Sequence, residues 1–253
     1  MHEKLGIATR FYGLAGGDVE RLSAWVDKAL SVVAAEHVYV AIRAEEDKSG
    51  AEEFLRKNYP KINAFPVIPW GRVVQAPNAL LLKAAERREE YLLFASTEYP
   101  ITPSLVSRLR SHMDSGTLIV GARLPQHDFK AEPGQHVLVE QASGLQIPWN
   151  TCGLWSLERL IHTGFVLTAD SAHDPDNAGM EEMGTIAAQQ ILWPGRATAK
   201  LVALHEGDLV KNTHGWNIQR YERYAHYLET KRSRSAAQLK RLSLPTPSVY
   251  HIG

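Results

Sequence analysis

Three polar residues follow an apolar run near the middle of the sequence. Residues 91–95 read Tyr-Leu-Leu-Phe-Ala, and the next three residues are Ser96, Thr97 and Glu98. A short apolar run rich in aromatic and large aliphatic residues is typical of a strand buried on both faces. Because Pro100 cannot continue a central strand, the polar side chains are expected at a strand end, where open α/β sheets bind ligands.

A pair of carboxylates begins a predicted helix later in the chain. Glu181 and Glu182 come just before a helix predicted over residues 185–192. The helix dipole keeps a carboxylate in the first turn ionised, and an ionised carboxylate can act as a general base toward a hydroxyl group. The pair also fits an acidic helix N-terminus with no further role, so both interpretations stay open.

The rest of the chain supplies the elements that must position these residues. Apolar runs predict strands, and apolar residues at helical spacing predict the helices between them. This alternation predicts an α/β fold with a mostly parallel central sheet flanked by helices. The predicted strands cover residues 4–12, 37–42, 64–69, 91–95, 117–124, 137–139 and 199–205, and the predicted helices cover residues 22–33, 51–58, 77–88, 105–113, 157–163, 185–192 and 219–232.

Chain length and the absence of a clear linker indicate one domain. The 253 residues are enough for a large α/β domain with a sizeable core, and no internal repeat is visible. We assign residues 1–230 to this domain. Residues 231–253 form a basic, then proline-containing C-terminal tail, which could pack on the domain, on a second subunit or on nothing.

Charge and cysteine content restrict the class of protein. Lys plus Arg and Asp plus Glu both total 28, so a nucleic-acid binder relying on a general positive field is disfavoured. The single cysteine, Cys152, excludes an intramolecular disulfide and a Cys-rich zinc site. No stretch approaches the ~20 apolar residues of a membrane span, and no signal-peptide pattern is present. We expect a cytoplasmic protein, with peripheral membrane association and homo-oligomer formation left open.

The stretch from Tyr91 to Pro103 resembles the strand-end motif of GT-A-fold glycosyltransferases, especially the family-2-like enzymes. In that family, an apolar strand leads into Asp-X-Asp and then into a turn ending in Thr-Pro or Ser-Pro. Here the motif positions are Ser96, Thr97 and Glu98, so serine replaces the first aspartate and glutamate the second. One carboxylate remains where the family uses two to hold a divalent metal on the nucleotide diphosphate.

Two later segments resemble the same family in the same order. Residues 147–165 are similar to the small-residue segment where donor sugar and acceptor meet. Within it, Trp149 and Asn150 suit sugar binding, because aromatic faces stack on sugars and an amide both donates and accepts hydrogen bonds. Both tryptophans could instead be core residues, and we expect that role for Trp155.

The acidic pair is similar to a family element in which an acidic residue acts as base on the acceptor hydroxyl. By position, Glu181 matches the family's glutamate and Glu182 its aspartate. The resemblance therefore implies that Glu182 is the catalytic base, with Glu181 beside it.

The resemblance also implies a divalent metal, Mn²⁺ or Mg²⁺. In several GT-A families a histidine after the last strand completes the metal shell, and His205 occupies that position here. Together with Glu98 it would form a site of one carboxylate and one imidazole, which suits Mn²⁺ better than Mg²⁺. A lone histidine is more often a structural residue, so this alternative remains.

Contacts with the nucleotide are implied at the ends of the first strands and helices. Each position has an alternative: Arg10 fits a solvated surface, Glu45 fits a charged loop before a helix, and Asn78 fits a helix cap. The full set implied to bind donor nucleotide is Thr9, Arg10, Glu45, Asn78, Ser96 and Thr97.

These expectations combine into a hexosyltransferase that moves a sugar from a nucleotide-sugar to an unknown hydroxyl acceptor, with inversion. The alternative is a non-catalytic GT-A-like binding or assembly protein that kept the fold after losing Asp-X-Asp. A nucleotidyltransferase on a related sheet is a third alternative, although the glycines of residues 13–17 fit its first loop poorly. Convergence of Glu98, Glu182 and His205 on one cleft would favour the enzyme.

Overall fold

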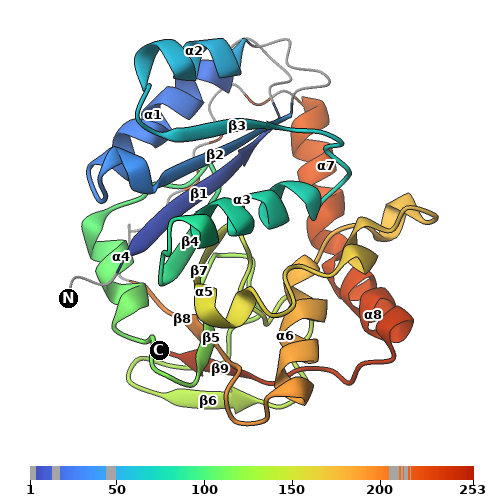
Figure 1. Ribbon diagram of the computed structural model, residues 1–253. Helices are drawn as coiled ribbons and strands as arrows, with labels where there is room; N and C mark the ends of the chain where they lie inside the picture. Colours follow the sequence, from blue (N-terminus) through green and yellow to red (C-terminus); the bar gives the residue numbers. More distant parts are fainter. Residues whose placement is uncertain are drawn as a thin grey trace.

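A nine-stranded sheet runs through the part of the chain that the structure describes (Figure 1). The computed structural model describes residues 4–12, 18–43, 50–204, 211, 213, 216 and 218–253. The strands are β1 (Leu5–Phe11), β2 (Val38–Arg43), β3 (Asn63–Val67), β4 (Tyr91–Ala95), β5 (Thr117–Ala122), β6 (His136–Val139), β7 (Cys152–Ser156), β8 (Thr198–Val202) and β9 (Val249–Ile252).

The strand order is β3-β2-β1-β4-β7-β5-β8-β9-β6. The first four strands in this order are parallel to one another, and so are β5, β8 and β9. Strand β7 lies between β4 and β5 and is antiparallel to both, while β6 pairs antiparallel with β9. The predicted α/β architecture with a mostly parallel central sheet is therefore confirmed.

Helices cover both faces of this sheet. They are α1 (Asp18–Leu30), α2 (Ala51–Asn58), α3 (Gln75–Glu86), α4 (Pro103–Arg110), α5 (Leu157–Leu160), α6 (Glu181–Leu192), α7 (Ile218–Glu229) and α8 (Lys231–Leu242), with short 3₁₀ helices η1 (Ala35–His37), η3 (Leu167–Asp170) and η4 (Pro175–Asn177). None of the helices within the described ranges is long and apolar enough to cross a membrane.

Two apolar cores lie on opposite sides of the sheet because neighbouring strand residues point to opposite faces. In β1, Ile7 belongs to the core that includes residues of α1, α2 and α4, whereas Ala8 belongs to the core that includes residues of α3, α5, α6 and α8. Burial on both faces explains why the strands read as continuous apolar runs. At the edge where the parallel strands end, the sheet is bordered by the segments that connect strands to helices.

The turn after β4 forms as the local sequence predicts. The strand ends at Ala95, and α4 begins at Pro103, where a missing N–H costs nothing. The side chain of Thr102 accepts a hydrogen bond of 3.1 Å from the backbone N–H of Leu105. This N-cap fixes the entry of α4 and leaves residues 96–99 at the end of the strand.

Strand β7 is an element that the sequence patterns did not predict. Residues 152–156 were expected to lead into a helix, but all five are buried in the sheet between β4 and β5. Gly153 permits this position, because a Cβ there would lie 3.0 Å from the carbonyl oxygen of Trp149. The helix that follows is reduced to the four residues of α5.

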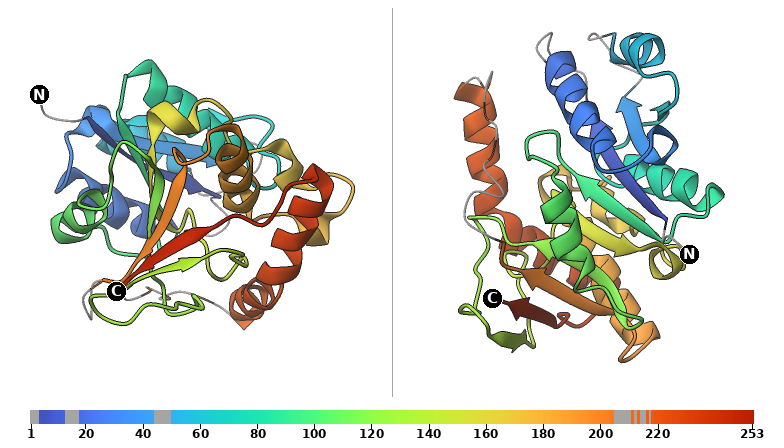
Figure 2. Two further views of the ribbon diagram at one scale, coloured as in Figure 1. Left: turned by 90° about the horizontal axis from the view of Figure 1, so that it is seen from below. Right: turned by 90° about the vertical axis from the view of Figure 1, so that its left-hand side faces the viewer.

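The C-terminal residues are also part of the body. The helix expected over residues 219–232 divides at Thr230 into α7 and α8. The segment expected as a tail, residues 231–253, forms α8 and then β9, which lies between β8 and β6 (Figure 2). Of the arrangements considered for this segment, the structure has it packed on the domain.

Candidate functional site

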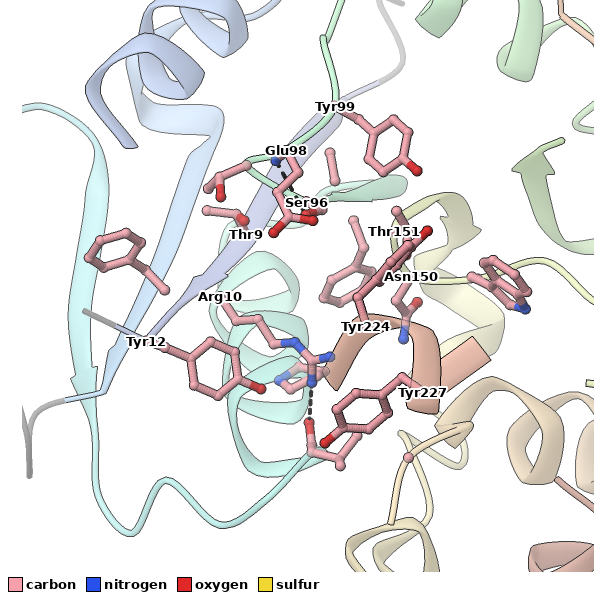
Figure 3. Close-up of a pocket in the computed structure, with 18 of the residues that line it drawn as sticks. Thr9, Arg10, Tyr12, Ser96, Glu98, Tyr99, Asn150, Thr151, Tyr224 and Tyr227 are labelled. Carbon is pink, nitrogen blue, oxygen red and sulfur yellow. Dashed lines mark hydrogen bonds between the residues drawn. The ribbon is translucent and has the colours of Figure 1, made fainter. Parts of the chain in front are cut away.

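A cleft of about 1350 Å³ lies at the carboxyl ends of β1 and β4 (Figure 3). Its walls are the ends of these strands, residues 149–151, residues 178–182, and side chains from α7 and α8. Carboxyl ends of parallel strands meet at one edge of a sheet. Polar side chains of the segments that follow these strands therefore lie close together there. This is the position that the sequence predicted for a ligand site.

Nine of the residues singled out in the sequence line this cleft. Asn78 is outside it: its amide donates to the carbonyl oxygen of Phe165 at 2.9 Å and accepts from the N–H of Phe165 at 2.8 Å. This side chain ties α3 to a distant turn and does not face a ligand. Glu45 and His205 lie outside the described residues. The nine in the cleft are Thr9, Arg10, Ser96, Thr97, Glu98, Trp149, Asn150, Glu181 and Glu182.

The acidic pair at the start of α6 is held by Asn150. The backbone N–H of Asn150 donates to Oε1 of Glu182 at 2.6 Å, and its side-chain amide donates to Oε1 of Glu181 at 3.1 Å. The amide oxygen of Asn150 accepts from the indole N–H of Trp155 at 2.9 Å. Asn150 thus positions the two carboxylates, and because it also lines the cleft, the expected sugar contact stays a prediction.

Burial sets the charge state of Glu182. Burial, and after it the charge of Glu181, raise the pKa of Glu182, whereas Lys231 and the N–H of Asn150 lower it, and the resulting pKa is about 7. Burial lowers the pKa of Lys231 to about 8, against the attraction of Glu182. A carboxyl group that titrates near neutral pH can accept a proton from an acceptor hydroxyl.

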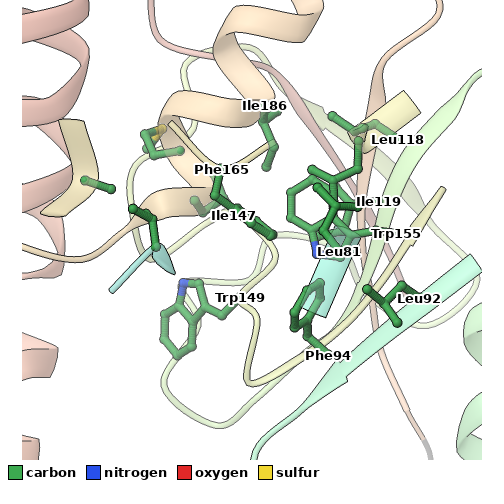
Figure 4. Packing of buried hydrophobic residues seen from close by; sticks show 14 of the residues in the cluster. Leu81, Leu92, Phe94, Leu118, Ile119, Ile147, Trp149, Trp155, Phe165 and Ile186 are labelled. Carbon is green, nitrogen blue, oxygen red and sulfur yellow. The ribbon is translucent and has the colours of Figure 1, made fainter. Parts of the chain in front are cut away.

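The two tryptophans near this pair have different surroundings (Figure 4). Trp155 is completely buried, as expected for a core residue. Trp149 lines the cleft but is 4% exposed, and its indole N–H donates to the carbonyl oxygen of Gly144 at 2.8 Å. The ammonium of Lys231 lies 3.7 Å from the Trp149 ring centroid, and the His127 ring centroid lies at 3.8 Å. Lys231 therefore takes a position that a sugar would need in order to stack closely on Trp149.

Arg10 is anchored inside the cleft at the end of β1. Its Nη1 donates to the carbonyl oxygen of Val73 at 2.9 Å and lies 3.9 Å from Oε1 of Glu181 (Figure 3). The backbone N–H groups of Val73 and Val74 donate in turn to the carboxylate of Asp170. Hydrogen bonds and a nearby carboxylate therefore fix the orientation of Arg10, unlike that of a freely solvated arginine.

At the other end of the cleft, Glu98 is paired with cations. Nη2 of Arg220 donates to Oε1 of Glu98 at 2.8 Å, and Nζ of Lys211 lies 3.4 Å from Oε2. Nη1 of the same arginine lies 3.6 Å from a carboxylate oxygen of Asp18. The guanidinium of Arg220 thus occupies the space between two carboxylates. Arg21 also pairs with Asp18 and reaches the hydroxyl of Thr97 at 3.4 Å.

These contacts do not fit the divalent metal that the resemblance implied. Both carboxylate oxygens of Glu98 already face a positive charge, which would repel a metal ion. In the described parts of the chain, no group of three or more His, Cys, Asp or Glu residues could hold a metal. The other expected ligand, His205, lies outside those parts. We therefore assign no step to a metal at Glu98.

Several cleft residues were not predicted from the sequence as site residues. They share an origin in the C-terminal part of the chain, where basic and aromatic residues recur at helical spacing. The sequence predicted a helix over residues 219–232, which carries four of these residues, but did not indicate which face of the sheet it covers. The residues are Lys211, Arg220, Tyr224, Tyr227, Lys231 and Arg234.

Comparisons with known proteins agree with this geometry at the level of the fold. No protein-family model and no curated protein matches the sequence. Among solved structures, the chain is similar to a mannosyltransferase from Pyrobaculum calidifontis in complex with GDP-Man and Mn²⁺. The TM-score is 0.56 and the identity 11%, over 96% of this chain and 76% of that chain.

A second similar structure is glucosyl-3-phosphoglycerate synthase from Mycobacterium tuberculosis. Its complex with phosphoglyceric acid gives a TM-score of 0.56 at 14% identity, over 96% of this chain and 81% of that chain. Its complex with Mn²⁺, UDP-glucose and phosphoglyceric acid gives 0.52 at 11% identity, over 93% and 80%. The chain therefore has the GT-A-like fold of nucleotide-diphospho-sugar transferases, as the strand-end motif predicted.

Proposed function

We propose that this protein is a glycosyltransferase that uses a nucleotide-sugar donor and a hydroxyl acceptor. The observation that carries the proposal is that Glu182, whose pKa burial raises to about 7, lines the same cleft as the polar end of β4. The class of donor is supported by the similar folds, which were solved with GDP-Man and with UDP-glucose.

In this proposal the two ends of the cleft have different tasks. The nucleotide lies along the ends of β1 and β4, against Thr9, Ser96 and Thr97. The acceptor hydroxyl approaches Glu182, the residue near the start of α6 whose carboxylate is already held by Asn150. The donor sugar lies between them, so that the leaving diphosphate and the base are on opposite sides of its anomeric carbon.

The transfer then proceeds as one displacement. Glu182 removes the proton of the acceptor hydroxyl while the acceptor oxygen forms a bond to the anomeric carbon. The bond from that carbon to the diphosphate oxygen breaks on the other face, and the electron pair leaves with the nucleoside diphosphate. One displacement of this kind inverts the anomeric configuration.

The first experiment is a thermal-shift panel of nucleoside diphosphates and their sugar conjugates, each with Mn²⁺ and with excess EDTA. Selective binding to the folded state raises the melting temperature by mass action. We expect one nucleotide class to raise it, and the corresponding labelled sugar to appear on a hydroxyl acceptor. If no compound in the panel raises the melting temperature, the proposed donor site is wrong.

A non-catalytic GT-A-like binding protein is the second candidate. The observation that favours it is the Arg220–Glu98 ion pair of 2.8 Å at a position where the resemblance implied a metal ligand. This candidate predicts a thermal shift with a nucleotide-sugar but no transfer of its sugar to any acceptor. Detection of transfer that is lost in Glu182→Gln would exclude it.

The cellular setting of this activity remains a prediction from the sequence. Cys152 is buried, and burial raises its pKa to about 12, so its thiol is inert at neutral pH. We still predict a cytoplasmic location. Contact with a membrane surface or with a second copy of the chain also stays a prediction.

A further inference from the structure

Cations from separate parts of the chain surround the end of β4. Arg21 comes from α1, Arg220 from α7, and Lys211 from the segment before α7. The side chains of Lys211 and Glu98 are only 14% and 18% exposed. At such partly buried positions, charges are poorly screened and attract an anion more strongly than surface charges do.

The charge of the cleft differs from that of the whole chain. The sequence contains 28 basic and 28 acidic residues, so it carries no net charge apart from histidine. Among the described residues that line the cleft, however, nine are Arg or Lys and five are Asp or Glu. A positive excess concentrated in one cleft suits a multiply charged anion such as a diphosphate.

We propose that Arg220, Lys211 and Arg21 bind the diphosphate of the donor directly, in place of a bridging divalent metal ion. This inference rests on the proposed function and names the chemistry by which its donor is held. A guanidinium donates two parallel hydrogen bonds to phosphate oxygens, and an ammonium adds a compact charge with three donors. Neither group needs the coordination shell that a metal requires.

In this arrangement Glu98 has a positioning role. It holds Arg220 at 2.8 Å and Lys211 at 3.4 Å, and Asp18 holds the other side of the Arg220 guanidinium at 3.6 Å. Aromatic rings add to this, since the Lys211 ammonium lies 3.2 Å from the ring centroid of Tyr224. The cations are therefore oriented before the donor arrives, which reduces the entropy lost on binding.

The two ways of holding a diphosphate make opposite predictions for Glu98. If Glu98 were a metal ligand, Glu98→Gln would remove binding. If Glu98 positions the cations, glutamine removes a competing negative charge and can still accept a hydrogen bond from Arg220. We therefore expect Glu98→Gln to bind nucleoside diphosphate as tightly as the wild type or more tightly.

The test is calorimetric titration of GDP and UDP into the full chain, with excess EDTA and with Mn²⁺. We expect the dissociation constant of the nucleotide that binds to be the same in both conditions. Arg220→Gln and Lys211→Met should each weaken binding about 10- to 100-fold, the usual effect of losing a charged hydrogen bond. The matched controls Arg196→Gln and Lys61→Met change exposed residues outside the cleft and should not alter binding.

The outcomes separate this inference from the proposed function. Binding that requires Mn²⁺ and is lost in Glu98→Gln would overturn the inference and leave a glycosyltransferase with a metal. Absence of binding by any nucleotide or nucleotide-sugar, with or without Mn²⁺, would overturn both. The comparison of EDTA with Mn²⁺ uses the wild-type chain, so it holds even if a variant fails to fold.

Discussion

At the scale of single residues, the environment of Glu182 decides what chemistry the cleft can perform. A solvated glutamate has a pKa of about 4.3 and is a weak base at neutral pH. Burial, with Glu182 only 5% exposed, and the charge of Glu181 bring the pKa of Glu182 to about 7. The positive charge of Lys231 limits that shift, so Glu182 still ionises within the physiological range.

The first prediction concerns this carboxylate. Glu182→Gln should lower the rate of sugar transfer about 10²- to 10⁴-fold, because the acceptor hydroxyl loses its base. Donor affinity should stay unchanged, since the nucleotide is proposed to lie at the other end of the cleft. The wild-type rate should rise with pH up to about 7 as Glu182 ionises, and the variant should lose this dependence. Rates measured against pH at saturating donor check both points.

Glu158→Gln is the matched control, because Glu158 is an exposed glutamate in the first turn of α5. It should transfer sugar at the wild-type rate. A Glu182→Gln variant that retains full activity and the wild-type pH profile would contradict the assignment of this residue as the base.

The second prediction concerns His127, which is held neutral in the folded protein. Its Nδ1 accepts from the N–H of Leu124 at 2.8 Å, and its Nε2 donates to the carbonyl oxygen of Ile147 at 3.1 Å. Burial lowers the pKa of His127 to about 3. Below pH about 6.5 the unfolded chain binds a proton here that the folded chain does not bind. The protein should therefore lose stability as pH falls from about 6.5 toward 3.

Urea unfolding at several pH values measures this loss. His127 alone can contribute a slope of at most about 1.4 kcal/mol per pH unit, and His127→Gln should remove that contribution. His173→Gln is the control, because His173 is exposed. An equal slope in the wild type and in His127→Gln would show that His127 is not the group responsible.

At the scale of elements, η3 holds the segment just before α3 in place. This segment contains Val73, the hydrogen-bond partner of Arg10. The carboxylate of Asp170 accepts hydrogen bonds from the N–H groups of Arg72, Val73 and Val74 at 3.1, 2.7 and 2.9 Å. These N–H groups lie just before α3, where a negative charge also interacts favourably with the helix dipole. The fixed turn presents the carbonyl oxygen of Val73 to Arg10.

The third prediction is that Asp170→Ala lowers the free energy of unfolding by about 2–3 kcal/mol, since three N–H groups lose a charged acceptor. Burial by itself would raise the pKa of Asp170, but the hydrogen bonds outweigh it and lower the pKa. The stabilisation is therefore present above pH about 4 and is lost at lower pH, where the variant should approach the wild type. Chemical denaturation at neutral and acidic pH measures both effects.

Asp176→Ala provides the comparison for this experiment, because Asp176 is an exposed aspartate in the neighbouring 3₁₀ helix η4. It should unfold like the wild type. If Asp170→Ala also unfolds like the wild type at neutral pH, the carboxylate does not hold the turn before α3.

At the scale of the whole molecule, the end of the chain completes the sheet. Strand β9 pairs in parallel with β8 on one side and antiparallel with β6 on the other. Within it, His251 is fully buried, accepts from the N–H of Lys130 at 2.9 Å and donates to the carbonyl oxygen of Gln146 at 2.8 Å. The last strand of the sequence thus joins segments that lie more than 100 residues before it.

The fourth prediction is that removal of residues 248–253 lowers the melting temperature by roughly 10 °C or more. The truncation exposes an edge of β8 and takes away the strand with which β6 pairs. Tyr250→Ser is the control, because this side chain in β9 is 40% exposed and its backbone pairing is unaffected. Circular dichroism melts that coincide for the truncated and full chains would contradict the structural role of β9.

Local sequence patterns determined the elements that depend on neighbouring residues. The strand at residues 91–95, the Thr102 cap and the acidic start of α6 follow from apolar spacing, proline positions and capping chemistry. Because strand ends of a parallel sheet meet at one edge, the sequence alone also predicted that Ser96, Thr97 and Glu98 face a ligand cleft. These signals need no knowledge of distant contacts.

Tertiary structure decided the features that depend on residues far apart in the chain. Strand β7 reads locally as the start of a helix, and it becomes a strand because two buried strands offer it hydrogen bonds. Arg220 reaches Glu98 across 122 residues, and Lys231 reaches the Glu182 pair from a segment that the sequence assigned to a tail. Pairings at such separations are set by packing of the whole fold, so a local pattern carries no information about them.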